Sequence, residues 1–152
     1  SAIQDRSIHE DALIFARNLH EMGKMGPGEW DSYLALYRQV VALLRRHGLG
    51  PRPWGKEGGT AVELFRVDRV DRRRRPYQGH RLARLAGRWE RATARLSPRA
   101  WFVPAATPLG RLACWLLEPE SPDGLTTWGF FDDHLAPGRY HPVLRVSPAG
   151  KE

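Results

Sequence analysis

The stretch WFVPAATPLGRLACWLLEPESPDGLTTWGFFDDHLAPGRYHPVLRV, residues 101–146, contains the clearest succession of structural signals in the chain. Residues 101–104 are mostly aromatic or β-branched, which favours a short strand. Pro108 can open a helix at its first turn, and apolar residues at helical spacing follow it. These apolar residues are Leu109, Leu112, Ala113 and Leu116. Pro119 cannot continue a helix, so the sequence predicts one helix near residues 108–117.

The second half of this stretch reverses the chain and leads to a final strand. Residues 121–124, Ser-Pro-Asp-Gly, have the order typical of a type I turn. A short amphipathic segment with Leu125, Trp128 and Phe131 follows, and residues 140–146 predict an edge strand. The reversal would bring Trp128 and Phe131 against the helix that carries Trp115. These aromatic side chains would then either leave an apolar patch open for docking or be buried in one core.

Upstream of this stretch, residues 60–70 contain enough β-branched and aromatic residues for a strand. The apolar pattern changes phase within it, between Val62 and Leu64 on one side and Phe65 and Val67 on the other. A β-bulge or burial of both faces would explain the change.

Residues 81–96 are ambiguous, because their apolar residues recur at helical spacing while Gly87 lies in the middle. The Pro- and Gly-rich residues 50–59 predict a loop. Arginines occupy four successive positions, Arg72, Arg73, Arg74 and Arg75, just before Pro76. They predict a solvated turn, with a basic patch for phosphates or an acidic protein as the alternative.

The N-terminal part predicts two helices. Residues 7–10, Ser-Ile-His-Glu, form a capping box, and apolar residues at helical spacing continue to Met22. A second helix is expected from about Trp30 to His47, with Gly48 at its C-terminal cap. The predicted fold is α+β: N-terminal helices packed on a small, mostly antiparallel sheet, with the further helix near 108–117.

The composition indicates one globular domain. A length of 152 residues fits one core, divided into a helical part, 1–48, and a sheet-plus-helix part, 60–152. No apolar run is long enough for a membrane span, and no signal-peptide pattern is present, so a soluble chain of unknown localisation is expected. The net charge of +7 invites a nucleic-acid interpretation, but only three of the basic residues are Lys, a bias that a GC-rich genome also produces.

A search for catalytic chemistry finds few candidates. Cys114, the only cysteine, lies in an apolar setting that predicts a buried and unreactive thiol. No zinc-binding HExxH motif is present. Potential metal ligands gather only in one cluster, which is otherwise a solvated loop: Asp132, Asp133, His134 and His141. Glu118 flanks the apolar helix near 108–117 and is either a proton carrier or a structural carboxylate paired with an Arg.

Several motifs within residues 101–146 resemble the C-terminal end of carboxypeptidase-A-like zinc metallopeptidases of a bacterial type. They are Val103-Pro104, Pro108-Leu109-Gly110-Arg111-Leu112, Leu116-Leu117-Glu118-Pro119-Glu120-Ser121, Asp123-Gly124-Leu125 and Trp128-Gly129-Phe130-Phe131-Asp132. Tyr77-Gln78-Gly79-His80 and His47-Gly48 fit the same pattern more loosely. The resemblance also favours two strands over residues 81–96.

The resemblance implies a hydrolase family in which an HxxE pair and a later His hold zinc, a Glu acts as base and an Arg binds the substrate carboxylate. Those motifs lie N-terminal to the matching part, and none of them maps onto this chain. Glu118, Asp123, Gly124 and Trp128 are family-motif residues without a catalytic role. The chain alone is therefore expected to bind no cofactor and to be inactive, with zinc implied only for an absent peptidase domain.

The resemblance thus predicts a non-catalytic C-terminal accessory domain that packs against a peptidase domain, or against a second copy of itself, and shapes the catalytic cleft. Nucleic acid is not expected as a partner in that case. The alternative is a stand-alone binding module that uses the Arg-rich face for nucleic acid or an acidic partner.

Overall fold

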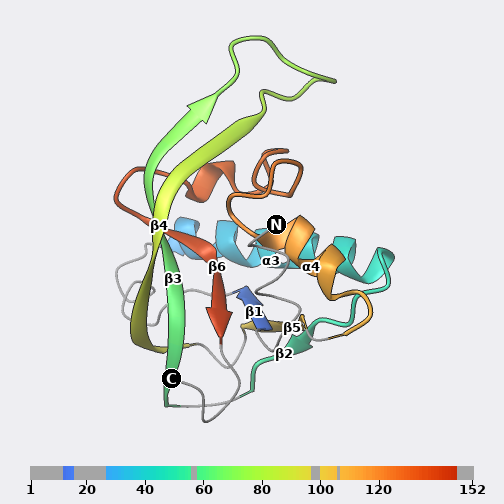
Figure 1. Cartoon of the computed structure of the whole chain (residues 1–152), viewed down its shortest axis with the longest axis vertical. Coiled ribbons are helices and arrows are strands. Elements are labelled where there is room, and N and C mark those ends of the chain that lie inside the picture. Colours follow the sequence, from blue (N-terminus) through green and yellow to red (C-terminus); the bar gives the residue numbers. More distant parts are fainter. Residues whose placement is uncertain (1–11, 16–26, 56–57, 97–99, 106, 147–152) are drawn as a thin grey trace.

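The computed structural model describes residues 12–15, 27–55, 58–96, 100–105 and 107–146. They form an α+β fold, as predicted, with one six-stranded antiparallel sheet in the order β2-β5-β1-β6-β3-β4 (Figure 1). The strands are β1 (Ala12–Phe15), β2 (Arg52–Pro53), β3 (Gly59–Arg72), β4 (Ala83–Arg95), β5 (Trp101–Pro104) and β6 (Tyr140–Val146). The helices are α3 (Pro27–Arg46), α4 (Gly110–Leu117) and the short 3₁₀ turn η1 (Asp132–His134).

Helix α3 confirms the second predicted helix, although it begins three residues earlier. Its buried side chains recur at helical spacing and form one face: Tyr33, Leu36, Tyr37, Val40, Val41 and Leu44. Gly48 has a φ of 84°, a conformation that favours glycine, and it ends the helix. The amide of Leu49 then donates to the carbonyl of Leu44, as expected of a glycine-terminated helix.

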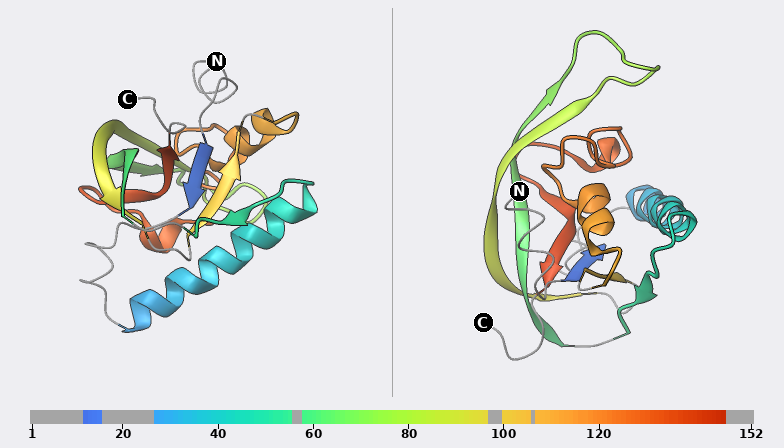
Figure 2. Two further views of the ribbon diagram at one scale, coloured as in Figure 1. Left: turned by 90° about the horizontal axis from the view of Figure 1, so that it is seen from below. Right: turned by 45° about the vertical axis from the view of Figure 1, so that its right-hand side comes forward.

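Strands β3 and β4 form a long hairpin that curves around one side of the molecule (Figure 2). The register between β3 and β4 shifts between Val67 and Arg69, and that between β3 and β6 shifts between Leu64 and Arg66. Val62, Leu64, Phe65 and Val67 are all buried. The change of phase seen in the sequence therefore reflects both predicted causes, an irregular register and burial on both faces.

Residues 81–96 do form β structure, but as one continuous strand rather than the two that were expected. The reason is that β4 pairs with β3 along its whole length. Gly87 allows this pairing, because a Cβ atom there would lie 2.1 Å from the carbonyl oxygen of Arg66 and 2.8 Å from the ring of Phe65. The glycine that weakened a helix interpretation is thus needed for close approach of the two strands.

The buried residues form two clusters on opposite faces of β6. One lies beneath both helices and includes Val103, Val143 and Phe131, so α3 and α4 lie on the same side of the sheet (Figure 2, right). The other includes Leu144 and Val146, which pair with Leu64 and Val62 of β3. The chain buries both faces of β6 in this way.

Three further secondary-structure predictions are wrong. Strand β6 is not an edge strand, because it pairs with β1 on one side and β3 on the other. Ala12–Phe15 belong to a strand rather than to the helix predicted over 7–22, and the rest of that segment lies outside the described residues. Arg52–Pro53, predicted as loop, pair with β5. A short apolar run such as residues 12–15 is compatible with both helix and strand, and here pairing with other strands determines that it is a strand.

Helix α4 lies within the predicted range, but its buried face differs by one or two positions from the expected one. Gly110, Ala113, Cys114 and Leu117 are buried. Leu112 and Leu116 are only partly buried, and Leu109 is 40% exposed. The side chain of Cys114 is fully buried, as the sequence predicts.

We expect Leu117→Ala to lower the free energy of unfolding by about 2–5 kcal/mol, because this fully buried side chain would leave a cavity. The same substitution at the exposed Leu109 should cost about 0.5 kcal/mol or less. Urea titrations of both variants provide the measurement. Equal losses at the two positions would contradict the observed orientation of α4.

Candidate functional site

Glu118 forms a buried ion pair at the C-terminal end of α4. Its Oε1 lies 2.9 Å from Nε of Arg145 on β6, and the two side chains are 1% and 8% exposed. The guanidinium carbon of Arg145 also lies 3.9 Å from the centroid of the Trp89 ring on β4, a cation–π contact. Glu118 thus joins α4, β6 and β4, and the structural interpretation of this carboxylate fits its surroundings.

Asp123, Gly124 and Trp128 build the turn that follows α4. The amide of Leu125 donates to the carbonyl of Leu116 at 2.9 Å, so the chain folds back on the helix as predicted. Gly124 packs tightly there, since a Cβ atom would lie 2.7 Å from the carbonyl oxygen of Trp115. The indole Nε1 of Trp128 donates to Asp123 Oδ1 across the turn.

The aromatic residues of this region do not form one common patch on α4. Phe131 is fully buried and contacts the ring of His141, with centroids 4.8 Å apart. Trp128 is partly exposed and faces the tip of the β3–β4 hairpin instead, where its ring centroid lies 6.0 Å from that of Tyr77 and 5.6 Å from that of His80. Trp115 is 37% exposed on α4.

The four candidate metal ligands occupy different environments. Asp132 Oδ1 forms an ion pair with Nη1 of Arg72 at a distance of 2.8 Å. The relative orientation of the two groups does not meet the geometry of a hydrogen bond. His141 is buried, and its Nδ1 accepts the amide of Val143, which leaves Nε2–H to donate to Thr126 Oγ1 at 2.8 Å. Within the described ranges, no group of three or more potential ligands is placed to hold a metal ion.

Asp133 and His134 lie elsewhere, beside a hollow of about 160 Å³ next to α3. His134 Nε2 lies 3.3 Å from the hydroxyl of Ser32, which lines the same hollow. A Ser–His pair is one part of a nucleophilic catalytic site. Such a site also needs a carboxylate that orients the His and a group that binds the oxyanion. Neither of these further parts is established among the described residues, so the Ser–His pair alone defines no reaction.

The β3–β4 hairpin carries the positive charge of the chain. Residues 59–95 contain eleven Arg and four Asp or Glu, a formal charge of +7, and the remaining residues have thirteen basic and thirteen acidic side chains. The five arginines between residues 81 and 95 are all exposed: Arg81, Arg84, Arg88, Arg91 and Arg95. The run Arg72–Arg75 is also exposed, in agreement with its prediction as a solvated turn.

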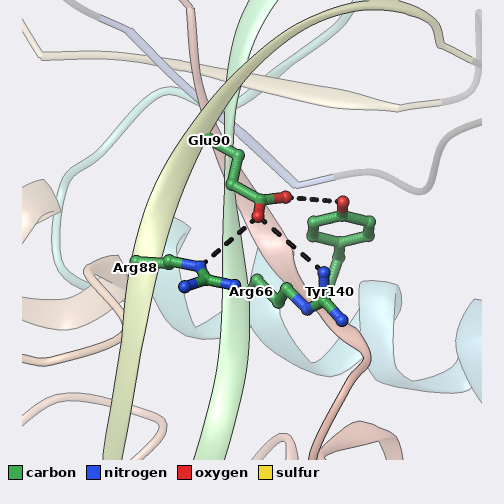
Figure 3. Close-up of polar contacts among 4 residues, drawn as sticks. All are labelled: Arg66, Arg88, Glu90 and Tyr140. Carbon is green, nitrogen blue, oxygen red and sulfur yellow. Dashed lines mark hydrogen bonds and ion pairs between the residues drawn. The ribbon is translucent and has the colours of Figure 1, made fainter.

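Glu90 is the main acidic partner within the hairpin (Figure 3). Its carboxylate accepts a hydrogen bond of 2.7 Å from the Tyr140 hydroxyl and lies 3.5 Å from Nε of Arg88 and 3.9 Å from Nη1 of Arg66. Tyr140 belongs to β6, so Glu90 ties β4 to the central strand while it balances charge. Arginines nearer the tip have fewer acidic neighbours.

Two adjoining hollows of about 210 and 190 Å³ open between the β3–β4 hairpin and the turn that follows α4. Arg84, Pro122 and Thr127 line both hollows, Arg72 and Arg73 line the first, and Glu120 and Ser121 line the second. Burial raises the pKa of the Glu120 carboxyl above its ordinary value, although the charge of Arg145 acts in the opposite direction. We call this pair of hollows the arginine groove.

No protein-family model, curated protein or solved structure matches the chain. Among the described residues, no helix is both long and apolar enough to cross a membrane. Sequence reasoning singled out Glu118 and the arginine run and placed Ser121 only in a turn, but it missed Arg84 and Arg145. The excess of Arg between positions 66 and 95 could have indicated Arg84, and the prediction that Glu118 pairs with an Arg did not identify which one.

We expect substitution of either member of the Glu118–Arg145 pair alone, such as Glu118→Gln or Arg145→Met, to cost about 3–5 kcal/mol, because each leaves a buried group uncompensated. The double variant should cost less than the two single losses together. Arg69→Gln is the matched control, since it breaks an ion pair of 2.8 Å whose side chains are 68% and 57% exposed. Its cost should stay below about 1 kcal/mol, and equal losses in denaturant titrations would refute the special role of the buried pair.

Proposed function

We propose that the chain is a non-catalytic accessory domain of a carboxypeptidase-A-like zinc metallopeptidase, and that it docks through its β3–β4 hairpin onto an acidic surface of the peptidase domain. The observation that carries this proposal is the separation of charge. The hairpin bears +7, whereas the rest of the chain is formally neutral. A domain with its charge concentrated on one projecting element is suited to electrostatic docking.

The roles of the family-motif residues support the accessory part of the proposal. Glu118 is paired with Arg145 in the core, and Gly124 packs against the backbone of α4. Trp128 bonds to Asp123 and lies against the hairpin tip. A motif whose residues maintain the fold in this way suits a structural domain, because a general base or a metal ligand would have to remain available to substrate.

The shape and exposure of the hairpin support the docking part. Its tip, residues 73–82, extends beyond the helices (Figure 1). Strand β4 is the last strand of the sheet, so its outer edge pairs with no other described strand, and its arginines are exposed. Arginine forms bidentate hydrogen bonds with carboxylates, which makes a row of exposed arginines a good match for an acidic protein surface.

Binding to nucleic acid is the second candidate, and one specific observation favours it. Tyr77 is 50% exposed at the hairpin tip, directly beside the run Arg72–Arg75. A two-stranded β ribbon fits the major groove of DNA, and an exposed aromatic ring can stack on unpaired bases.

The family assignment predicts that the open reading frame upstream of the segment encoding this chain contains an HxxE motif and a later His within a peptidase domain. Sequencing that region and expressing the whole frame would test it, with zinc measured by elemental analysis. Zinc should be present in the whole product and absent from the present chain. An upstream frame without these motifs would exclude the peptidase assignment while leaving the hairpin proposal open.

The docking proposal predicts that the chain binds poly-L-glutamate and that this binding weakens between about 50 and 200 mM NaCl. Replacing Arg73, Arg74 and Arg75 by Gln should reduce the affinity at least about tenfold, since three phosphate- or carboxylate-binding charges are removed. The matched control replaces three exposed arginines outside the hairpin, Arg38, Arg46 and Arg111, by Gln. This variant has the same net charge and should bind nearly as well as the unsubstituted chain.

Fluorescence anisotropy with labelled poly-L-glutamate and with a 20-base-pair DNA duplex, at equal ionic strength, separates the two candidates. Tighter binding of the duplex that also depends on Tyr77 would favour the nucleic-acid function. Equal weakening by both triple variants would show that total charge rather than the hairpin determines binding, and would refute both.

A further inference from the structure

The arginine groove has the features of a ligand site that none of the functions above requires. Its two hollows, of about 210 and 190 Å³, adjoin at Arg84, Pro122 and Thr127. Liquid water occupies about 30 Å³ per molecule, so each hollow has space for roughly six waters. That space suits a small anion or the end of a larger one.

The charges around the groove leave a positive excess. Arg72 is engaged with Asp132 at 2.8 Å, and Asp71 is engaged with Arg69 at 2.8 Å. Arg73 and Arg84 pair with no carboxylate in the described part of the chain. The two arginines come from opposite arms of the hairpin, Arg73 just after β3 and Arg84 on β4, and both line the first hollow.

Ser121 supplies the second, independent observation. Its side chain is only 3% exposed and lines the second hollow, and its hydroxyl oxygen has no hydrogen-bond partner among the described residues. The backbone of Ser121 is fixed, because its amide donates to the carbonyl of Glu118 and its carbonyl accepts the hydroxyl of Thr127. A buried hydroxyl without a partner is costly, so its presence beside a basic hollow points to a ligand atom that completes its hydrogen bonding.

We propose that the arginine groove binds a small oxyanion, a phosphate or a carboxylate group, between the guanidinium of Arg84 and the hydroxyl of Ser121. The planar guanidinium can donate two parallel hydrogen bonds to two oxygens of either group. The Ser121 hydroxyl donates to a third oxygen of the anion or to one of the two oxygens that Arg84 binds. Arg73 adds long-range attraction from the first hollow.

Glu120 is the acidic group that opposes such a ligand. It lines the second hollow together with Arg84 and Ser121, and burial disfavours its charged form. Its ionised carboxylate repels an anion, so Glu120→Gln should tighten binding.

The site can be tested by isothermal titration calorimetry and NMR shift mapping with sodium phosphate and with sodium succinate, each at constant ionic strength against chloride. The unsubstituted chain should saturate with at least one of the two anions. Arg84→Gln should weaken binding about tenfold or more, and Ser121→Ala should weaken it several-fold. Arg95→Gln is the matched control, because Arg95 is exposed at the far end of the same strand and carries the same charge.

Ser121→Ala should leave the melting temperature unchanged or raise it, since a hydroxyl without a partner is removed, so weaker binding by this variant would not reflect unfolding. Saturation by phosphate alone or by succinate alone would support the site and identify its ligand class. No saturation by either anion, or equal weakening by Arg84→Gln and Arg95→Gln, would overturn the proposal. It does not depend on the peptidase assignment or on the docking role of the hairpin.

Discussion

The buried ion pair between Glu118 and Arg145 is the interaction on which the rest of the structure depends. It joins the C-terminal end of α4 to the central strand β6, and the same guanidinium packs on Trp89 of the hairpin. Removing two charges from water costs several kcal/mol each, so such a pair does not by itself favour the folded chain over the unfolded one. It does disfavour every arrangement in which one of these charges is buried alone. We infer that the pair specifies how helix, strand and hairpin fit together.

The position of the arginine groove follows from that junction. The turn after α4 begins at Glu118, and its hydrogen bonds return the chain to the helix at Leu116. The hairpin is fixed opposite this turn by Trp89 on Arg145 and by the bond from the amide of Ala83 to the carbonyl of Thr127. Two rigid segments thus face each other with the groove between them. Arg84, next to Ala83, is held where it lines both hollows, which is the kind of positioning that a binding site needs.

Local sequence patterns correctly predicted the elements that nearby residues stabilise. They failed for the elements whose conformation depends on pairing with residues distant in the sequence. Helix α3 has a regular apolar face and Gly48 at its end, so its limits were within reach of the sequence. Residues 12–15 are an apolar run that only pairing with β5 and β6 makes a strand. The single strand β4 likewise depends on β3. The site was less predictable still, because Arg84 and Ser121 lie far apart in the sequence and meet only through the hairpin and the turn.

The arginines of β4 satisfy two physical requirements at once. An edge strand exposes unpaired backbone groups that can recruit another strand, and charged side chains along it oppose such aggregation. That protection requires only like charge along the edge, and it would be satisfied by lysine or glutamate as well. It does not explain why, among the described residues, Arg73 and Arg84 have no acidic partner beside a hollow and the buried hydroxyl of Ser121 has no hydrogen-bond partner. Edge protection therefore accounts for the outer arginines, and ligand binding accounts for those at the groove.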